Sequence, residues 1–178
     1  MKTKNKNSII DSFWNFLSKL LLPFCILCVA LVLFLNVFFI AKVPSGSMLN
    51  TIKIGDMLLV KNSFFCNEIK RGDICVFKKT GENFLLVKRV VGLPGEKIEM
   101  KDGTVYINDK KLKESYVSSK CDTNQVFYVP DNSYLFLGDN RANSLDSRYP
   151  TVGVIKKSQI EGRTKLRIWP LNKIGNVK

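Results

Sequence analysis

The sequence contains no histidine. This absence excludes Ser-His-Asp and Cys-His nucleophilic centres, zinc sites of the His-Glu-x-x-His type and proton relays through imidazole. An enzyme made from this chain therefore has to perform its acid–base chemistry with another side chain.

Cysteine is scarce and poorly arranged for chemistry. Cys25 and Cys28 have Cys-x-x-Cys spacing but lie inside a long apolar segment, where neither a thioredoxin-like nor a metal-binding role is expected. The other three, Cys66, Cys75 and Cys121, are odd in number. One disulfide plus one free thiol and three isolated thiols both stay open. We expect no metal and no other cofactor.

The chain also lacks internal repeats and Gly/Ser- or Pro-rich linkers, and its 178 residues leave room for one modest domain plus accessories. Beyond residue 41, short β-branched and apolar runs alternate with Gly, Asp and Asn, a pattern typical of strands. Residues around 154–160 are weakly helical. We expect residues 42–178 to form one mostly β domain with a compact antiparallel sheet, including a hairpin turn at Asp102-Gly103. The expected strands are 57–60, 74–78, 84–91, 97–100, 104–107, 126–129, 134–137 and 165–169.

One long hydrophobic run precedes this domain. Residues 20–41 depart from an apolar sequence only at Pro23 and Asn36, and about 20 apolar residues of helix span the hydrocarbon layer. A cleaved signal peptide is the alternative, but its apolar region is usually only ~7–15 residues long and ends at small residues. We therefore predict a retained transmembrane helix over residues 20–41.

The charges on either side of this run predict its orientation. Residues 1–19 contain four lysines and one aspartate, a net charge of +3, and short basic tails stay in the cytoplasm. Residues 42–178 would then lie on the extracytoplasmic face of the cell membrane. They hold 24 basic and 14 acidic residues, and a tethered basic domain meets anionic lipid rather than nucleic acid. The alternative, that this charge only reflects background residue usage, stays open.

The segment Pro44-Ser45-Gly46-Ser47-Met48 can present a nucleophile just beyond this run. Pro44 fixes its own φ, and Gly46 permits a tight turn before Ser47. An attacking hydroxyl needs such a bend, with free amide N–H groups nearby to bind an oxyanion. Taken alone, the motif is also compatible with an ordinary turn.

Lys88 is the candidate base. In the strand predicted there it shares one face with Phe84, Leu86 and Val90, while Arg89 points to the other face. An amine desolvated by apolar neighbours loses its preference for the charged form, so its pKa falls from ~10.4 toward the range that suits a general base. A lysine whose head group reaches solvent is the alternative.

Residues 138–148 follow a short apolar strand and are rich in hydrogen-bonding side chains. This composition suggests a buried polar network, in which Asp146 can pair with Arg148 and a serine hydroxyl can orient the lysine amine.

Four segments, in this order, resemble the motif boxes of bacterial type I signal peptidases. They are PSGSM at 44–48, GD with an apolar strand at 55–61, KRVVGLPGE at 88–96 and GDNRANSLDSR at 138–148. The resemblance extends from residue 38 to the segment 169–175. It implies a membrane-bound serine endopeptidase with a Ser/Lys dyad, which removes signal peptides from exported preproteins after small residues.

The resemblance also implies roles for individual residues. Ser47 matches the nucleophile and Lys88 the general base, and the Ser47 amide and Ser45 hydroxyl match the oxyanion hole. The residues matching those that position the lysine and support the loop are Ser144, Asp146, Arg148, Asp139 and Asn140. The matching pocket walls are Met48, Ile52, Leu86 and Val87. The substrate would lie extended between residues 42–45 and 82–87.

Two positions depart from the family pattern, and both bear on loop geometry and substrate preference. Asn50 stands where proline is usual, and Ala142 where aspartate is common. Two other functions stay open: a pilin-maturing peptidase of a conjugation system with the same chemistry, and a non-enzymatic, membrane-anchored basic β domain. Self-cleaving repressors with Ser/Lys chemistry carry a DNA-binding helical region, whose place the apolar run occupies here.

Overall fold

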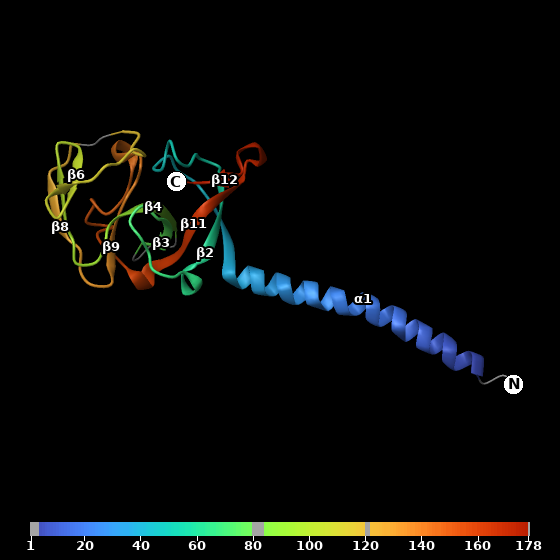
Figure 1. The fold of residues 1–178 in the computed structure, drawn as a ribbon. Coiled ribbons are helices and arrows are strands. Elements are labelled where there is room, and N and C mark those ends of the chain that lie inside the picture. Colours follow the sequence, from blue (N-terminus) through green and yellow to red (C-terminus); the bar gives the residue numbers. More distant parts are fainter. Residues whose placement is uncertain (1–3, 80–83, 120–121, 178) are drawn as a thin grey trace. The chain divides into compact units, whose positions relative to one another are not determined.

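The computed structural model describes residues 4–79, 84–119 and 122–177, with side chains from residue 11 onward. The chain divides after Val37 into two compact units, one helical and one built of strands (Figure 1).

The first unit is a single helix, α1 (Lys4–Val37). Within it, Asp11–Val37 is long and apolar enough to cross a membrane. At ~1.5 Å per residue, its 27 residues extend about 40 Å, more than the ~30 Å hydrocarbon layer. The expected end of the helix at residue 41 is wrong. Residues 38–41 belong instead to strand β1 (Phe38–Lys42), because pairing with β2 satisfies their backbone groups.

A large antiparallel sheet forms the body of the second unit. In spatial order its main strands are β1, β2 (Met57–Asn62), β11 (Ile160–Trp169), β3 (Ile74–Lys78), β4 (Leu85–Gly92), β9 (Ser133–Leu137) and β10 (Ile155–Lys156), and β12 (Gly175–Asn176) pairs with β11.

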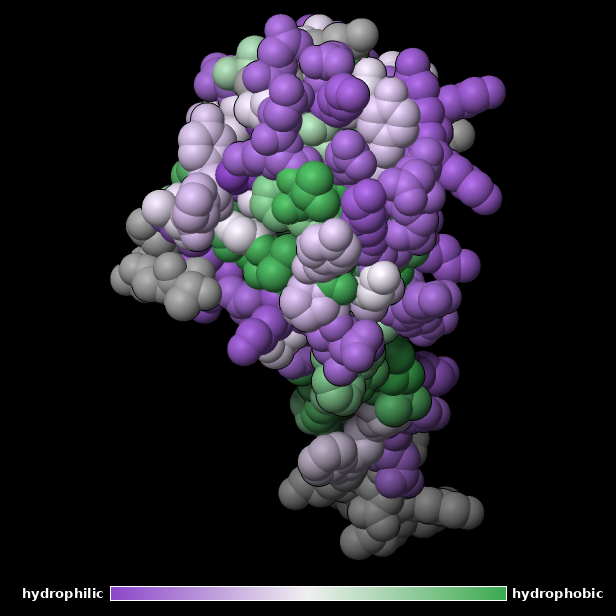
Figure 2. Space-filling model, turned by 90° about the vertical axis from the view of Figure 1, so that its left-hand side faces the viewer, coloured by the Kyte–Doolittle hydropathy of each residue, from purple (hydrophilic) through white to green (hydrophobic). Residues whose placement is uncertain are grey.

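A smaller sheet is attached to it. Its strands lie in the order β7 (Lys110–Lys111), β6 (Thr104–Ile107), β5 (Lys97–Lys101) and β8 (Gln125–Tyr128). The predicted turn joins β5 to β6, with positive φ values of 50° at Asp102 and 68° at Gly103. Figure 2 shows the molecule from the side of β6 and β8, where the surface is largely hydrophilic with a small hydrophobic area.

Gly92 ends β4 where side chains of the two sheets meet. A Cβ at this position would lie 2.9 Å from side-chain atoms of Ile98 and Leu135 and 3.0 Å from Val129. Glycine therefore allows β9 and the small sheet to close tightly around the end of β4, the strand that carries Lys88.

The mostly β prediction is confirmed, and each expected strand overlaps an observed one. The weakly helical stretch at 154–160 forms only one 3₁₀ turn, Lys157–Gln159, between β10 and the start of β11. Pairing with β9 and β3 therefore overrides its weak local preference.

Candidate active site

Ser47 lies in the turn that connects β1 to β2. Two backbone hydrogen bonds of 2.9 Å close the base of this turn, from Val43 N to Asp56 O and from Gly55 N to Val43 O. The Asp56 carboxylate also pairs with Arg167 of β11 at 2.8 Å. The turn is thus anchored to the large sheet, and Ser47 is only 6% exposed.

Lys88 reaches Ser47 from β4. It is 2% exposed, and its Nζ lies 2.6 Å from Ser47 Oγ and 3.2 Å from the Val87 carbonyl oxygen. Leu86 and Val90, on the same face of the strand, are buried as expected. The structure therefore brings together a hydroxyl and an amine that are 41 residues apart in the sequence.

Burial lowers the pKa of the Lys88 amine from 10.5 to about 8. Asp146 and, more weakly, Asp139 act in the opposite direction, because a nearby negative charge favours the ammonium form. Burial is the larger effect, so at pH 7 roughly a tenth of the amines are neutral. A neutral amine at this distance can accept the Ser47 hydroxyl proton.

Two possible oxyanion donors lie on the same turn. The Ser45 hydroxyl donates to Ser47 Oγ at 3.4 Å. The Ser47 amide is adjacent to it, in a turn whose carbonyls are bound by Asn140. Asn140 donates from Nδ2 to Gly46 O and from its backbone N–H to Ser47 O, both at 3.0 Å.

Ser144 and Asp146 lie near the dyad, and Arg148 binds Asp146. Asp146 and Arg148 form a two-pronged ion pair at 2.8 and 2.9 Å, and the Gly138 N–H also donates to Asp146. Ser144 Oγ is buried and has no hydrogen-bond partner among the described residues. A Cβ on Gly138 would lie 2.2 Å from Ser144 Oγ and 2.6 Å from Ser47 O, so glycine is required for this close approach.

Asp139 forms a second buried ion pair on the other face of β4. Its carboxylate accepts from Arg89 Nε and Nη2 at 2.8 and 2.7 Å and from Thr51 Oγ1 at 2.5 Å. The Arg89 guanidinium also lies 4.0 Å from the centre of the Tyr116 ring. This pair connects β4, the nucleophile turn and the loop after β9.

A pocket of about 400 Å³ opens at the dyad. Met48, Leu86 and Val87 line it as expected, but Ile52 does not. Ile52 is fully buried in the same core cluster as Met48, because its N–H bonds back to Met48 O at 2.8 Å and turns it inward. Residues 82 and 83 of the expected substrate-binding segment lie outside the described residues.

Phe84 and Leu85 also line the pocket, within the expected substrate-binding segment 82–87, whereas no pocket role was predicted for Asn143 and Leu145. Leu145 carries the clearest signal, since it is the one large apolar side chain in the polar segment 138–148.

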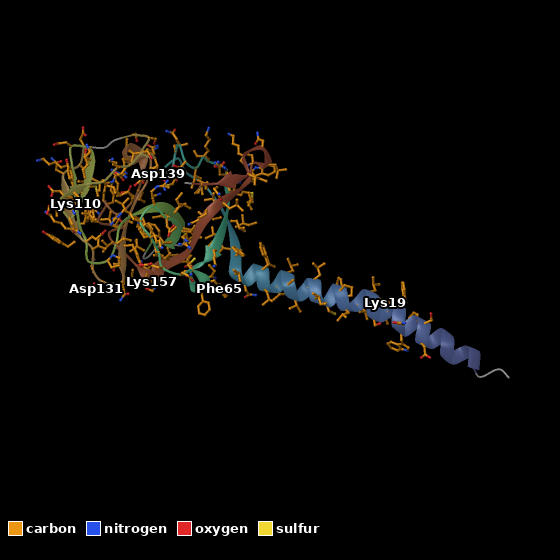
Figure 3. The ribbon with its side chains drawn as sticks, viewed as in Figure 1. Lys19, Phe65, Lys110, Asp131, Asp139 and Lys157 are labelled. Carbon is orange, nitrogen blue, oxygen red and sulfur yellow. The ribbon has the colours of Figure 1, made fainter. Side chains whose placement is uncertain are left out.

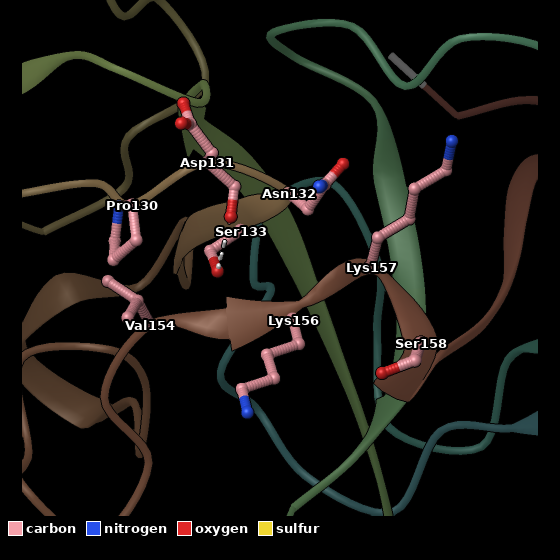
Figure 4. Close-up of a pocket in the computed structure, with 8 residues that line it drawn as sticks. All are labelled: Pro130, Asp131, Asn132, Ser133, Val154, Lys156, Lys157 and Ser158. Carbon is pink, nitrogen blue, oxygen red and sulfur yellow. Dashed lines mark hydrogen bonds between the residues drawn. The ribbon is translucent and has the colours of Figure 1, made fainter.

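Another pocket, of about 630 Å³, contains none of the predicted site residues (Figure 4). Figure 3 shows its residues Asp131 and Lys157 at the lower edge of the β unit, away from Asp139.

Among the described cysteines, Cys25, Cys28, Cys66 and Cys75 are free thiols, and Cys121 lies outside the described residues. The dyad pocket is therefore the candidate active site.

Comparisons with known proteins find one matching family and several relatives. Residues 16–169 match the family described as signal peptidase, peptidase S26. Signal peptidase I of Bacillus amyloliquefaciens is 36% identical over 190 residues, covering 99% of this chain and 97% of the relative. Signal peptidase I of Leptolyngbya laminosa is 41% identical over 145 residues, covering 76% and 70%. A crystal structure of a signal peptidase I from Enterococcus faecalis V583 matches with a TM-score of 0.50 and 32% identity, covering 55% of this chain and 97% of that one.

Proposed function

This chain belongs to the signal peptidase family, peptidase S26, and is a serine endopeptidase; from this premise we propose that Ser47 and Lys88 cleave signal peptides from exported preproteins. The observation that carries the proposal is the 2.6 Å separation of the buried Ser47 Oγ and Lys88 Nζ beside a pocket of about 400 Å³. The relatives are signal peptidases, so the pilin-maturing alternative is not favoured.

In the acylation step, Ser47 Oγ attacks the scissile carbonyl carbon while its proton passes to the neutral Lys88 amine. The negative charge on the carbonyl oxygen is stabilised by the Ser47 N–H and the Ser45 hydroxyl. The Lys88 ammonium then protonates the leaving amine, which departs as the N-terminus of the mature protein. The signal peptide remains as an ester on Ser47.

Deacylation repeats these chemical steps with water as the nucleophile. The neutral Lys88 amine takes a proton from the water, whose oxygen attacks the ester carbonyl. Collapse of the second tetrahedral intermediate returns the proton to Ser47 Oγ and releases the signal peptide. The buried Ser144 hydroxyl has no hydrogen-bond partner among the described residues, Lys88 included, so it is available to bind the amine during these steps. The ion pairs of Asp146 and Asp139 hold the surrounding loop.

Substrate choice follows from the pocket walls. Met48, Leu86 and Val87 make an apolar lining that admits small side chains at the cut position and two residues before it. Bulky side chains would need these buried walls to move, which costs free energy in a packed interior.

We further propose that α1 anchors the enzyme, with its basic N-terminus in the cytoplasm and the β unit on the extracytoplasmic face beside anionic lipid. The length and hydropathy of Asp11–Val37 support this arrangement. Confining the enzyme and its substrates to one surface raises their effective concentration.

The proposal is tested by incubating the detergent-solubilised full-length protein with a preprotein and identifying the cut by mass spectrometry. Ser47→Ala should reduce cleavage to background, because it removes only the nucleophilic oxygen. Ser158→Ala, a change at an exposed serine of the other pocket, serves as the matched control and should cleave like the wild type. If Ser47→Ala cleaves as well as the wild type, the proposal is wrong.

The pH dependence gives a second test. The Lys88 ammonium cannot accept a proton, so kcat/KM should rise with pH and level off above a midpoint of about 8. A rate that stays constant between pH 6 and 9 would argue against Lys88 as the base.

A further inference from the structure

The connection between β7 and β8 touches the active-site loops at a place to which no role has yet been assigned. Ser119 forms an isolated parallel bridge with Asn140, and its carbonyl accepts from Arg141 N at 3.2 Å. Its hydroxyl donates to Asn140 Oδ1 at 2.5 Å and accepts from Ala142 N at 3.1 Å. Ser119 is therefore bound at several points to the loop that follows β9.

The Ser119 hydroxyl fixes the orientation of the Asn140 amide. With Oδ1 bound to Ser119, the other end of the amide, Nδ2, faces Gly46 O and donates to it at 3.0 Å. The Asn140 backbone N–H donates to Ser47 O, also at 3.0 Å. Asn140 thus binds the carbonyl immediately before the nucleophile and the nucleophile's own carbonyl.

The first of these bonds determines where the Ser47 amide points. Gly46 C=O and Ser47 N–H belong to one peptide unit, and this peptide bond is trans. The C=O and N–H of a trans peptide point in opposite directions. Binding Gly46 O on the Asn140 side therefore directs the Ser47 N–H away from Asn140. Among the described residues the Ser47 N–H has no backbone or side-chain acceptor, and both Gly46 and Ser47 line the dyad pocket.

We propose that Ser119, acting through Asn140, is a positioning residue that aims the Ser47 amide at the oxyanion. The inference rests on the proposed function, in which this amide is an oxyanion donor. Such a donor acts on the transition state more than on the bound substrate, so its misalignment lowers kcat and leaves KM nearly unchanged. Removing an entire donor typically costs ~10²–10³-fold in kcat. A donor that is present but poorly aimed should cost less, about tenfold for Ser119→Ala.

The experiment compares Ser119→Ala with Ser119→Thr, which keeps the hydroxyl. Ser115→Ala is the matched control, an exposed serine of the same connection for which the described residues provide no side-chain hydrogen bond. Each full-length variant is assayed in detergent for kcat, KM and the pH midpoint of kcat/KM. Inhibition by a peptide aldehyde is also measured. Ser47 Oγ adds to the aldehyde carbonyl carbon, and the hydroxyl proton passes to Lys88. The resulting oxyanion depends on the same oxyanion-hole donors as the transition state.

Ser119→Ala should lower kcat about tenfold and weaken inhibition by the aldehyde by a similar factor. KM should stay within about twofold of the wild-type value, and the pH midpoint should not change. Ser119→Thr and Ser115→Ala should behave like the wild type. Wild-type kcat in Ser119→Ala, a loss confined to KM, or an equal loss in Ser119→Thr would overturn the proposal.

If Ser119→Ala melts below the assay temperature, Asn140→Asp decides instead, because it replaces the donor to Gly46 O with a carboxylate oxygen at equal volume. Wild-type kcat in a folded Asn140→Asp variant would then overturn the proposal.

The failure of this inference differs from the failure of the proposed function. An inactive Ser47→Ala together with a fully active Ser119→Ala removes the positioning role alone. An active Ser47→Ala removes both.

Discussion

The two faces of strand β4 carry adjacent cations that are equally buried but have different partners. Lys88 is 2% exposed and Arg89 3%. The Arg89 guanidinium contacts the Asp139 carboxylate through two hydrogen bonds, whereas among the described residues the Lys88 ammonium bonds only to neutral oxygens, those of Ser47 and Val87. Burial therefore lowers the pKa of Lys88 to about 8.

The difference between the partners of Lys88 and Arg89 shows how one strand can support both structure and chemistry. A buried charge with a well-aligned opposite charge is a structural link, because the pair compensates part of the desolvation cost. A buried amine without a contacting carboxylate gives up its proton more easily and can act as a base near neutral pH. The partner on each face, and not the depth of burial, separates the two functions.

The comparison is tested most severely by exchanging the cations. Lys88→Arg should lower kcat/KM by at least ~10³-fold, because a guanidinium stays protonated at any usable pH and cannot accept the Ser47 proton. Arg89→Lys is the matched exchange on the other face. It keeps the charge near Asp139 but loses the two parallel hydrogen bonds, so it should lower stability while retaining cleavage that Lys88→Arg lacks. Preprotein cleavage measures both, and substantial cleavage by Lys88→Arg would remove Lys88 from its proposed role.

Removing the carboxylate from the Arg89 side should expose the structural role of that face. Asp139→Asn leaves the guanidinium buried without its counter-charge, which typically costs ~3–5 kcal/mol in unfolding free energy. Glu161→Gln is the control, since Glu161 pairs with Lys78 at 3.8 Å and the two side chains are 42% and 60% exposed. That change should have little effect. Denaturant unfolding measures both, and equal effects would show that burial does not distinguish these pairs.

Local patterns in the sequence were enough to predict most strands, whereas the pairing of Ser47 with Lys88 was implied only by the resemblance of four segments to a known family. Alternation along β4 places Lys88 between apolar neighbours, and Pro44 and Gly46 predict the turn at Ser47, but the burial of Ser47 was not predicted. The change from helix to strand after Val37 was not predictable in this way, because residues 38–41 continue the apolar run. Pairing with β2 decides their conformation.

Two side-chain positions were also not predictable. The resemblance implies a pocket wall at Ile52, yet its backbone bond to Met48 turns the side chain into the core. The Ser119 hydroxyl binds Asn140 from 21 residues away, and nothing around Ser119 in the sequence marks it. Such contacts depend on how loops meet in space, which alternation and turn chemistry do not specify.

The smallest expected effect is on the free energy of unfolding. It arises because Lys88 is buried without a contacting carboxylate among the described residues. The folded-state pKa of Lys88, about 8, lies below its unfolded value. Below pH 8 both states are therefore protonated, and the buried ammonium costs up to ~3 kcal/mol of stability. This cost shrinks as the pH rises above 8, because the folded state releases its proton first, and it disappears above ~10.4.

Lys88→Met, of similar shape, should accordingly be inactive but raise Tm at pH 7, by roughly 5 °C for about 2 kcal/mol in a chain of this size. The gain should fade toward pH 10, while Lys156→Met, at an exposed lysine, should show no gain at either pH. A gain of equal size at pH 7 and pH 10 would mean that better packing, rather than removal of a buried charge, stabilises the variant.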